Sequence, residues 1–210
     1  MGYQYKFYID GTEYGMSDVA SVKLEHPLFD KLSVGNTCSA ELDITFWPKR
    51  SIPKMARIVP FVIAENGTET KLGEFWTDTR EKVGDRLRII AYDAMMRGNL
   101  VWVPRSNLQF PPETGLPMPD AVAEICRLMD VELDSRTVLS ASYGIDHPAN
   151  DWTLRDVLGF IGAAHAGNWI ITAEGKLLLI PLFAPVAGAA NYLADENGDP
   201  ILFGGETILV

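Results

Sequence analysis

Three histidines are the first residues to weigh for chemistry, because imidazole serves both acid–base catalysis and metal binding. His26, His147 and His165 are not spaced as metal ligands or as half of a nucleophile–base pair. His165 falls at the end of an expected helix, where a cation interacts favourably with the helix dipole, and we favour that role over catalysis. His147 could join Asp146 and Asp151 in an acid–base cluster, but a polar loop is the preferred interpretation. The sequence therefore predicts no catalytic residue and no metal site.

Two carboxylates on one face of an expected strand form the next candidate. Glu41 and Asp43 have the spacing with which some glycosidases present an acid and a base. Alternation along a strand also places polar residues there, so a solvated face is favoured unless a cleft covers it. The acidic run 195–199 has part of a calcium-loop spacing without the downstream glutamate, and we interpret it as a turn. Both the dinucleotide and the P-loop glycine patterns are missing, so no cofactor is predicted.

Five tryptophans are the remaining candidates for a binding surface: Trp47, Trp76, Trp102, Trp152 and Trp169. Such rings can stack on sugars, although buried or interface anchors are commoner. We take Trp47, Trp76 and Trp102 as candidate interface aromatics. The sequence favours a protein that is not an enzyme.

The elements that position these residues begin with a strand-rich region over 1–100. In 39–47, Ala40, Leu42, Ile44 and Phe46 alternate with polar residues, so one face is expected to be core and the other polar. Further strands are expected at 3–9, 22–24, 57–65, 70–75, 76–82 and 86–92, with turns at Asp10-Gly11, Asn66-Gly67 and Gly84-Asp85. Strands this short and this numerous predict an antiparallel β-barrel or a compact sandwich, within an α+β, mainly β fold.

The residue pattern changes over 101–183, where a proline-rich stretch (101–119) precedes an α+β module. The module is expected to contain helices near 120–129 and 153–166 and a hairpin at 168–180. Thr153 and Asp156 are spaced as a capping box for the second helix. A short helix, 94–97, is expected to start from Asp93 as its N-cap. Residues 184–210 are predicted to be a linker and the start of a further β segment.

Composition narrows the class of protein. The 210 residues carry a formal charge of −10, which disfavours phosphate-driven nucleic-acid binding, and 47% are hydrophobic, enough for a substantial core. No apolar run is long enough for a membrane-spanning helix, and no signal peptide is evident, so no membrane anchor is expected. Cys38 and Cys126 are expected to be small core residues rather than a disulfide.

Two segments resemble the hub proteins of bacteriophage tails and tail-like particles. Residues 151–171, continuing to 175–181, resemble that family's Thr-x-Arg-Asp/Glu-x-Leu-x-x-Ile-Ala-x-x-x-Gly-x-x helix and its Gly-Lys/Arg-Leu hairpin. Residues 73–77 and 89–95 resemble its strand pair and Tyr-Asp-Ala helix start. The resemblance implies a homotrimeric ring at the tip of the tail tube, with two tube-like β-barrels in each subunit. The family's second barrel is completed by later sequence, whereas this sequence stops at Val210.

The same resemblance implies partners and a location. The partners are the tail tube or distal tail protein, the tape-measure protein, and receptor-binding or puncturing proteins. DNA is expected to pass through the ring without specific binding, with Glu41 and Asp43 facing the lumen. The protein is expected in the virion, at the tail tip, after synthesis in the cytoplasm of the host bacterium.

Two alternatives stay open. One is a distal tail ring protein that joins tube and hub, which six-fold rather than three-fold symmetry would reveal. The other is a carbohydrate-binding or cell-wall-hydrolase-associated module that uses tryptophans as platforms, which glycan titration would reveal.

Overall fold

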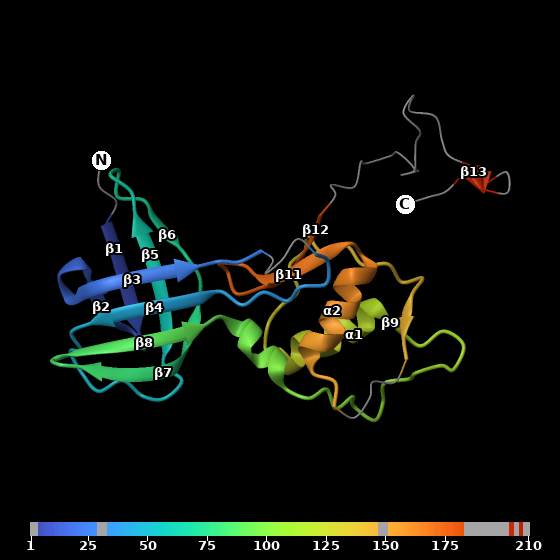
Figure 1. Cartoon of the computed structure of the whole chain (residues 1–210), viewed down its shortest axis with the longest axis horizontal. Helices are drawn as coiled ribbons and strands as arrows, with labels where there is room; N and C mark the ends of the chain where they lie inside the picture. Colours follow the sequence, from blue (N-terminus) through green and yellow to red (C-terminus); the bar gives the residue numbers. More distant parts are fainter. Residues whose placement is uncertain (1–3, 29–32, 147–150, 183–201, 204–205, 208–210) are drawn as a thin grey trace.

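The computed structural model describes residues 4–28, 33–146, 151–182, 202–203 and 206–207. The first three ranges form two units along the long axis of the molecule (Figure 1). The first unit is a β-sheet, and the second packs two α-helices with short strands. The fold is mainly β with antiparallel ladders, as predicted. Most of the predicted 184–210 segment lies outside the described residues. Within it, β13 (Leu202–Phe203) pairs antiparallel with β14 (Glu206–Thr207).

The first unit is one eight-stranded sheet. Its hydrogen-bonded order is β2-β1-β5-β7-β8-β4-β3, and β6 pairs with β5 at the side. The strands are β1 (Gln4–Ile9), β2 (Thr12–Gly15), β3 (Val19–Glu25), β4 (Glu41–Phe46), β5 (Arg57–Ile63), β6 (Glu69–Lys71), β7 (Phe75–Val83) and β8 (Arg86–Tyr92).

The two ends of this sheet belong to one stretch of chain. Strands β2 and β3 are separated only by the 3-10 helix η1 (Met16–Asp18), yet β2 pairs with β1 while β3 pairs with β4. The backbone N–H of Trp47 donates to the carbonyl oxygen of Asp18 at 2.9 Å, which ties β4 to this corner. No ladder joins β2 to β3 among the described residues, so a closed barrel is not found there and stays a prediction.

Strand β4 shows why the sheet encloses a core. Leu42, Ile44 and Phe46 are fully buried, whereas the residues between them are half-buried. Ile44 lies opposite Ile89 of β8, which is also fully buried. These side chains pack with apolar residues of β1, β2, β5 and β7, so the predicted division into a core face and a polar face is confirmed for β4.

The turn predicted at Asp10-Gly11 is confirmed, whereas the strand predicted at 70–75 is only partly present. Asp10 and Gly11 both have positive φ (45° and 77°), as a two-residue hairpin turn requires. The strand expected at 70–75 is wrong beyond Lys71, because Gly73 has a φ of 146° and interrupts the extended chain. Phe75 instead begins β7.

The second unit begins directly after β8. The predicted turn of helix is present as the 3-10 helix η2 (Ala94–Asn99), capped by Asp93. Helix α1 (Met118–Met129) starts two residues before the expected boundary, because a proline, here Pro119, is tolerated in the first turn of a helix. The short strand β9 (Leu116–Pro117) leads directly into this helix and pairs antiparallel with β10 (Gly144–Ile145).

A buried glutamate ties the proline-rich segment to α1. The Glu124 carboxylate has no exposed surface and accepts two hydrogen bonds from Arg127, at 2.8 and 3.0 Å. Arg105 adds an ion pair at 2.8 Å from the 101–119 segment. The hydrogen bond from Arg127 holds the pKa of Glu124 below its usual range. The loop is therefore anchored by charge as well as by packing.

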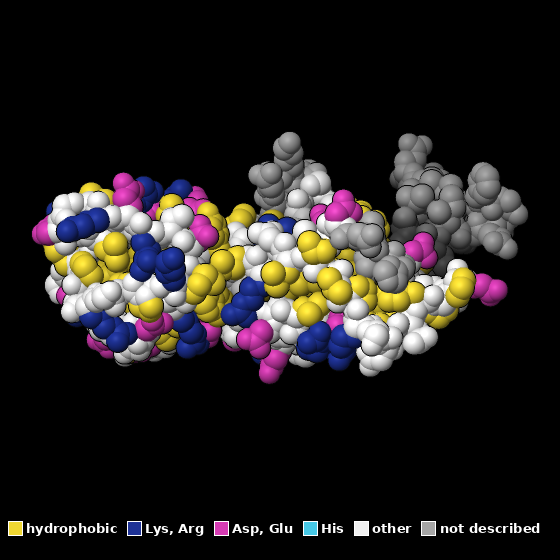
Figure 2. Space-filling model, turned by 90° about the horizontal axis from the view of Figure 1, so that it is seen from below, with side chains coloured by type: hydrophobic (Ala, Val, Ile, Leu, Met, Phe, Trp, Pro, Cys, Tyr) yellow, Lys and Arg dark blue, Asp and Glu magenta, His cyan; other side chains and the backbone are white. Residues whose placement is uncertain are grey.

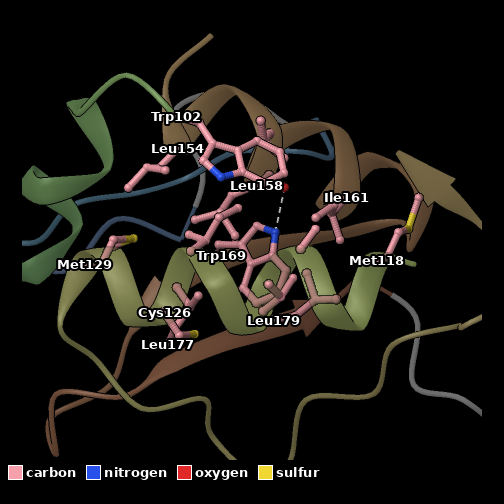
Figure 3. Close-up of a cluster of buried hydrophobic side chains, with 14 of the residues drawn as sticks. Trp102, Met118, Cys126, Met129, Leu154, Leu158, Ile161, Trp169, Leu177 and Leu179 are labelled. Carbon is pink, nitrogen blue, oxygen red and sulfur yellow. Dashed lines mark hydrogen bonds between the residues drawn. The ribbon is translucent and has the colours of Figure 1, made fainter. Parts of the chain in front are cut away.

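Helix α2 (Leu154–Ala164) and the hairpin β11 (Gly167–Ile171) with β12 (Leu177–Pro181) form the predicted module. The capping box is confirmed: the Asp156 N–H donates to Thr153 Oγ1 at 3.1 Å, and the Thr153 N–H donates to Asp156 Oδ2 at 2.8 Å. The Trp169 indole N–H donates to the carbonyl oxygen of Leu158 at 2.7 Å, inside the core (Figure 3). That bond connects β11 of the hairpin to helix α2.

Candidate functional site: a polar sheet face and an interdomain joint

The outer face of β4 carries the two carboxylates singled out from the sequence. Glu41 and Asp43 lie on the side of the strand opposite to its buried residues. Asp43 accepts two hydrogen bonds from Arg88 of β8, from Nε at 3.0 Å and from Nη2 at 2.7 Å. These bonds hold the pKa of Asp43 below its usual range. Asp43 is therefore engaged in an ion pair with Arg88 of the neighbouring strand.

Neighbouring strands extend this polar face. Lys23 of β3 lies directly opposite Asp43, and Glu81 of β7 lies opposite Arg88. Both signs of charge are therefore interspersed, as they are elsewhere on the first unit (Figure 2). We define the four-stranded part β7-β8-β4-β3 as the polar sheet. That Glu41 and Asp43 line a lumen stays a prediction.

The three candidate interface aromatics occupy three different environments. Trp47 is 36% exposed, with Arg86 over its ring at 4.6 Å and its indole N–H donating to Asp85 at 3.0 Å. Trp76 is partly buried and is covered by Arg97 at 4.5 Å. Trp102 is only 2% exposed and packs inside the core of the second unit, so its expected place at a surface is corrected.

The remaining aromatics leave little room for a sugar platform. Trp169 is fully buried, and Trp152 stacks against Phe160 at 4.9 Å. An open hollow of about 690 Å³ lies over β1 and β5, with Tyr8 and Phe61 in its lining. The Lys6 ammonium lies over one face of both of these rings, 5.3 and 5.7 Å from their centroids.

A joint between the two units is the most elaborate polar arrangement that the structure describes, and sequence reasoning did not identify it. The segment before β4 lies along β11 of the second unit. Trp169 donates its backbone N–H to the Asn36 carbonyl at 2.8 Å, and the N–H groups of Gly35 and Cys38 donate to the carbonyls of Gly167 and Trp169. The segment 35–38 before β4 is therefore hydrogen-bonded along the edge of the β11–β12 hairpin.

Asp93, which follows β8, stabilises the same joint by hydrogen bonds. Its carboxylate accepts hydrogen bonds from Ser39 Oγ at 2.9 Å, the Ala40 N–H at 2.8 Å and the Met95 N–H at 2.9 Å. Asp93 is 3% exposed, and burial raises its pKa to about 6 against the opposing effect of these hydrogen bonds. The sequence indicated only its role as an N-cap, because the partners at 39–40 are remote in the chain.

Arg155 connects α2 to the same place. Its Nη2 donates to the carbonyl oxygen of Met95 at 3.0 Å, while its buried Nε has no hydrogen-bond partner among the described residues. Burial lowers the pKa of Arg155, and the negative charge of Asp93 opposes that shift. The hydrogen bond from Arg155 to Met95 thus joins α2 to η2.

His165 lies at the C-terminal end of α2, where the sequence places it. Its Nδ1 lies 2.8 Å from the carbonyl oxygen of Ile161, and its Nε2 accepts the Ser140 N–H at 2.9 Å. The ring therefore bridges the end of α2 to Ser140. His147 and the 195–199 run lie outside the described residues.

No group of three or more His, Cys, Asp or Glu side chains in the described ranges is placed to hold a metal ion. No helix there is long and apolar enough to cross a bilayer.

Solved structures with a similar fold include two tail proteins. A tail protein from Neisseria meningitidis MC58 matches with a TM-score of 0.60 and 12% identity, over 96% of this chain and 53% of that one. The 43 kDa tail protein of prophage MuSo2 from Shewanella oneidensis matches with a TM-score of 0.58 and 8% identity, over 91% of this chain and 59% of that one. No protein-family model matches, and no curated protein matches. The chain spans between half and three fifths of the length of these two tail proteins and shares their fold.

Proposed function

We propose that this protein is a structural component of a phage or phage-like tail, and that it forms a ring-shaped hub at the tail tip. The observation that carries the proposal is the fold similarity to two tail proteins, one of them from a prophage, over more than nine tenths of this chain. In this role the protein acts by assembly and not by catalysis.

The internal architecture supports a load-transmitting role. The joint couples the two units through backbone hydrogen bonds and the buried Asp93, so force on one unit reaches the other without a flexible linker. Asp43 and Glu124 are engaged in ion pairs and Asp93 caps η2, which ties these carboxylates to structural roles. Such an arrangement suits a part that is held between other proteins.

The hub role adds specific partners to this proposal. The ring is a homotrimer that continues the tail tube, contacts the tube or distal tail protein and the tape-measure protein, and carries receptor-binding or puncturing proteins. DNA passes through it, and Glu41 and Asp43 face the passage. Both signs of charge are interspersed on this face and Arg88 is paired with Asp43, so the face presents no continuous positive surface to phosphates and DNA slides without binding.

Electron microscopy of purified particles tests the proposal. A tag on this chain, detected with gold-labelled antibody, is expected at the tail tip, and deletion of its gene is expected to give particles without a complete tip. Particles that lack the chain, or that assemble normally without it, contradict the proposal. Six-fold density at the tag favours the alternative, a distal ring protein between tube and hub.

The carbohydrate-binding alternative is less well supported. Trp102 and Trp169 are buried, and arginine side chains cover Trp47 and Trp76. Titration with cell-wall glycan fragments tests it, and saturable binding that is lost in Trp47→Ala would revive this alternative.

A further inference from the structure

The segment 35–39 forms one edge of the small sheet in the second unit. Figure 1 shows that the chain between β3 and β4 reaches from the first unit to the β11–β12 hairpin. Thr37 forms a parallel bridge with Trp169 of β11, and Leu133 forms another with Leu177 of β12 on the far side of the hairpin. Among the described residues, no further strand pairs with the segment 35–39.

The backbone groups of Thr37 and Ser39 have no partner at this edge. The Asn36 carbonyl and the Cys38 N–H both bond to Trp169. Since alternate residues of a strand direct their N–H and C=O groups to the same neighbour, the groups of Thr37 point away from β11. Neither they nor the N–H and C=O of Ser39 form a hydrogen bond among the described residues. Unpaired groups of this kind are a template on which an extended peptide adds as a strand.

An open hollow of about 500 Å³ lies beside this edge. Thr37 and Ser39 line it, together with Pro27, Asn36 and Arg155. Its volume is in the range of hollows that hold ligands in proteins. The unpaired backbone groups therefore border a space that can receive another chain segment.

Arg155 is the charged side chain among the residues that line this hollow. Its Nη2 donates to the carbonyl oxygen of Met95, and its buried Nε has no hydrogen-bond partner among the described residues. Asp93 attracts this guanidinium, but its carboxylate accepts hydrogen bonds from Ser39, Ala40 and Met95 instead. A guanidinium that lacks an ion pair is complementary to a carboxylate, to which it donates through a fork of N–H groups.

We propose that the segment 35–39 is a docking edge for a partner protein, whose extended segment adds as a strand and places an Asp or Glu side chain against Arg155. Backbone hydrogen bonds to Thr37 supply the pairing, and Arg155 supplies the preference for an acidic residue. Because the hollow is open, the partner chain continues past Arg155, so we assign the carboxylate to a side chain rather than to a chain end. The inference goes beyond the proposed function, since it names a further interaction surface on the second unit.

Binding of synthetic peptides to the purified protein tests the docking edge. Short peptides of alternating Thr and Val, blocked at both ends, carry a neutral fluorophore and a single Asp that is moved through the inner positions to sample each register. Fluorescence anisotropy is expected to find a register in which the Asp peptide binds at least about tenfold more tightly than the same peptide with Asn. A series in which no peptide binds, or in which Asp and Asn peptides bind equally, overturns the proposal.

Methylation of peptide nitrogens tests for strand pairing without changing the protein. Alternate residues of the bound strand direct their N–H groups toward the docking edge, and the residues between them direct theirs away. Methyl groups on the first set are expected to abolish binding, whereas methyl groups on the second set should leave the affinity within about twofold. Equal effects from the two sets contradict pairing along the backbone and overturn the proposal.

Hydrogen exchange locates the bound peptide on the protein. In the free protein the unpaired Thr37 N–H should exchange faster than the Cys38 N–H, which bonds to Trp169. Saturating peptide is expected to slow the exchange of Thr37 at least about tenfold and to change that of Cys38 less. Unchanged exchange of Thr37 at saturation overturns the proposal. Protection of Thr37 that rises with protein concentration in the absence of peptide would assign the edge to a second copy, and this outcome also overturns it.

Substitution of Arg155 tests the charge preference. In Arg155→Gln the preference for Asp over Asn should disappear while weak binding along the edge remains, which separates a lost charge pair from a lost fold. Arg155→Lys keeps the charge and should retain part of the preference. Arg86→Gln removes a guanidinium that lies over Trp47 in the first unit, and it should leave the preference unchanged. A full preference in folded Arg155→Gln, checked by circular dichroism, overturns the proposal.

These outcomes separate the docking edge from the tail function. If gold labelling places the chain at the tail tip while no peptide binds, only the docking edge is wrong. If peptides bind and protect Thr37 while purified tails lack the chain, only the tail function is wrong.

Discussion

Replacing Asp93 with asparagine tests whether burial or hydrogen bonding has the larger effect on the pKa of this carboxyl group at the joint. Burial raises the pKa of Asp93 from its ordinary value of 3.8 to about 6, so the folded protein binds this proton more tightly than the unfolded chain. The resulting stabilisation is fully present below pH 3.8 and is lost as the pH rises through 6. Asparagine keeps the shape of the side chain and removes the titration.

The expected magnitude follows from those two pKa values. Between pH 4 and pH 7 the contribution of Asp93 protonation to the free energy of unfolding should fall by about 2 kcal/mol. The wild type minus Asp93→Asn difference should fall by that amount as the pH rises, which corresponds to a change of roughly 4–8 °C in the difference between their melting temperatures. Using this difference removes the contribution of carboxylates that both proteins share.

Urea unfolding at several pH values, followed by circular dichroism and by tryptophan fluorescence, provides the measurement. Asp134→Asn is the matched control with the opposite sign, because a hydrogen bond from Arg136 lowers the pKa of Asp134. Because its folded pKa lies below its ordinary value of 3.8, its difference from wild type should grow as the pH rises toward about 5 and stay flat above that. If the Asp93→Asn difference also grows or stays flat, the three hydrogen-bond donors outweigh burial and the reasoning is refuted.

Three further substitutions test the packing of the second unit and the joint. Thr153→Ala removes the capping box and should cost about 1 kcal/mol in urea unfolding, whereas an unchanged midpoint would show that the cap contributes nothing. Trp169→Phe removes the indole bond to Leu158 and should lower the unfolding free energy by at least about 1 kcal/mol; a stability equal to wild type would contradict the buried bond. Gly35→Ala places a methyl group 2.7 Å from a carbonyl oxygen of α2 at a φ of +79°, whereas Gly67→Ala has a similar φ of +81° and open space. Gly35→Ala should therefore be clearly the more destabilising of the two by thermal melting, and equal losses would mean that only backbone strain matters.

Local patterns accounted for the elements that depend on neighbours in the chain. The capping box at Thr153, the turn at Asp10-Gly11 and the alternation in β4 each rest on residues within a few positions, so the sequence was sufficient to predict them. It failed at Gly73, where one backbone dihedral breaks an otherwise strand-like run.

Contacts between distant residues were decided only by the tertiary structure. The sequence marked Asp93 as a helix cap, but its hydrogen bonds to 39–40 and its proximity to Arg155 arise from packing two units together. Trp102 shows the same limit, since an indole fits a surface or a core equally well by composition, and the helices around it determined that it is buried. Local hydrogen bonding and periodicity thus determined the strands and helices, whereas burial and pairing across the chain determined the joint and the free edge beside it.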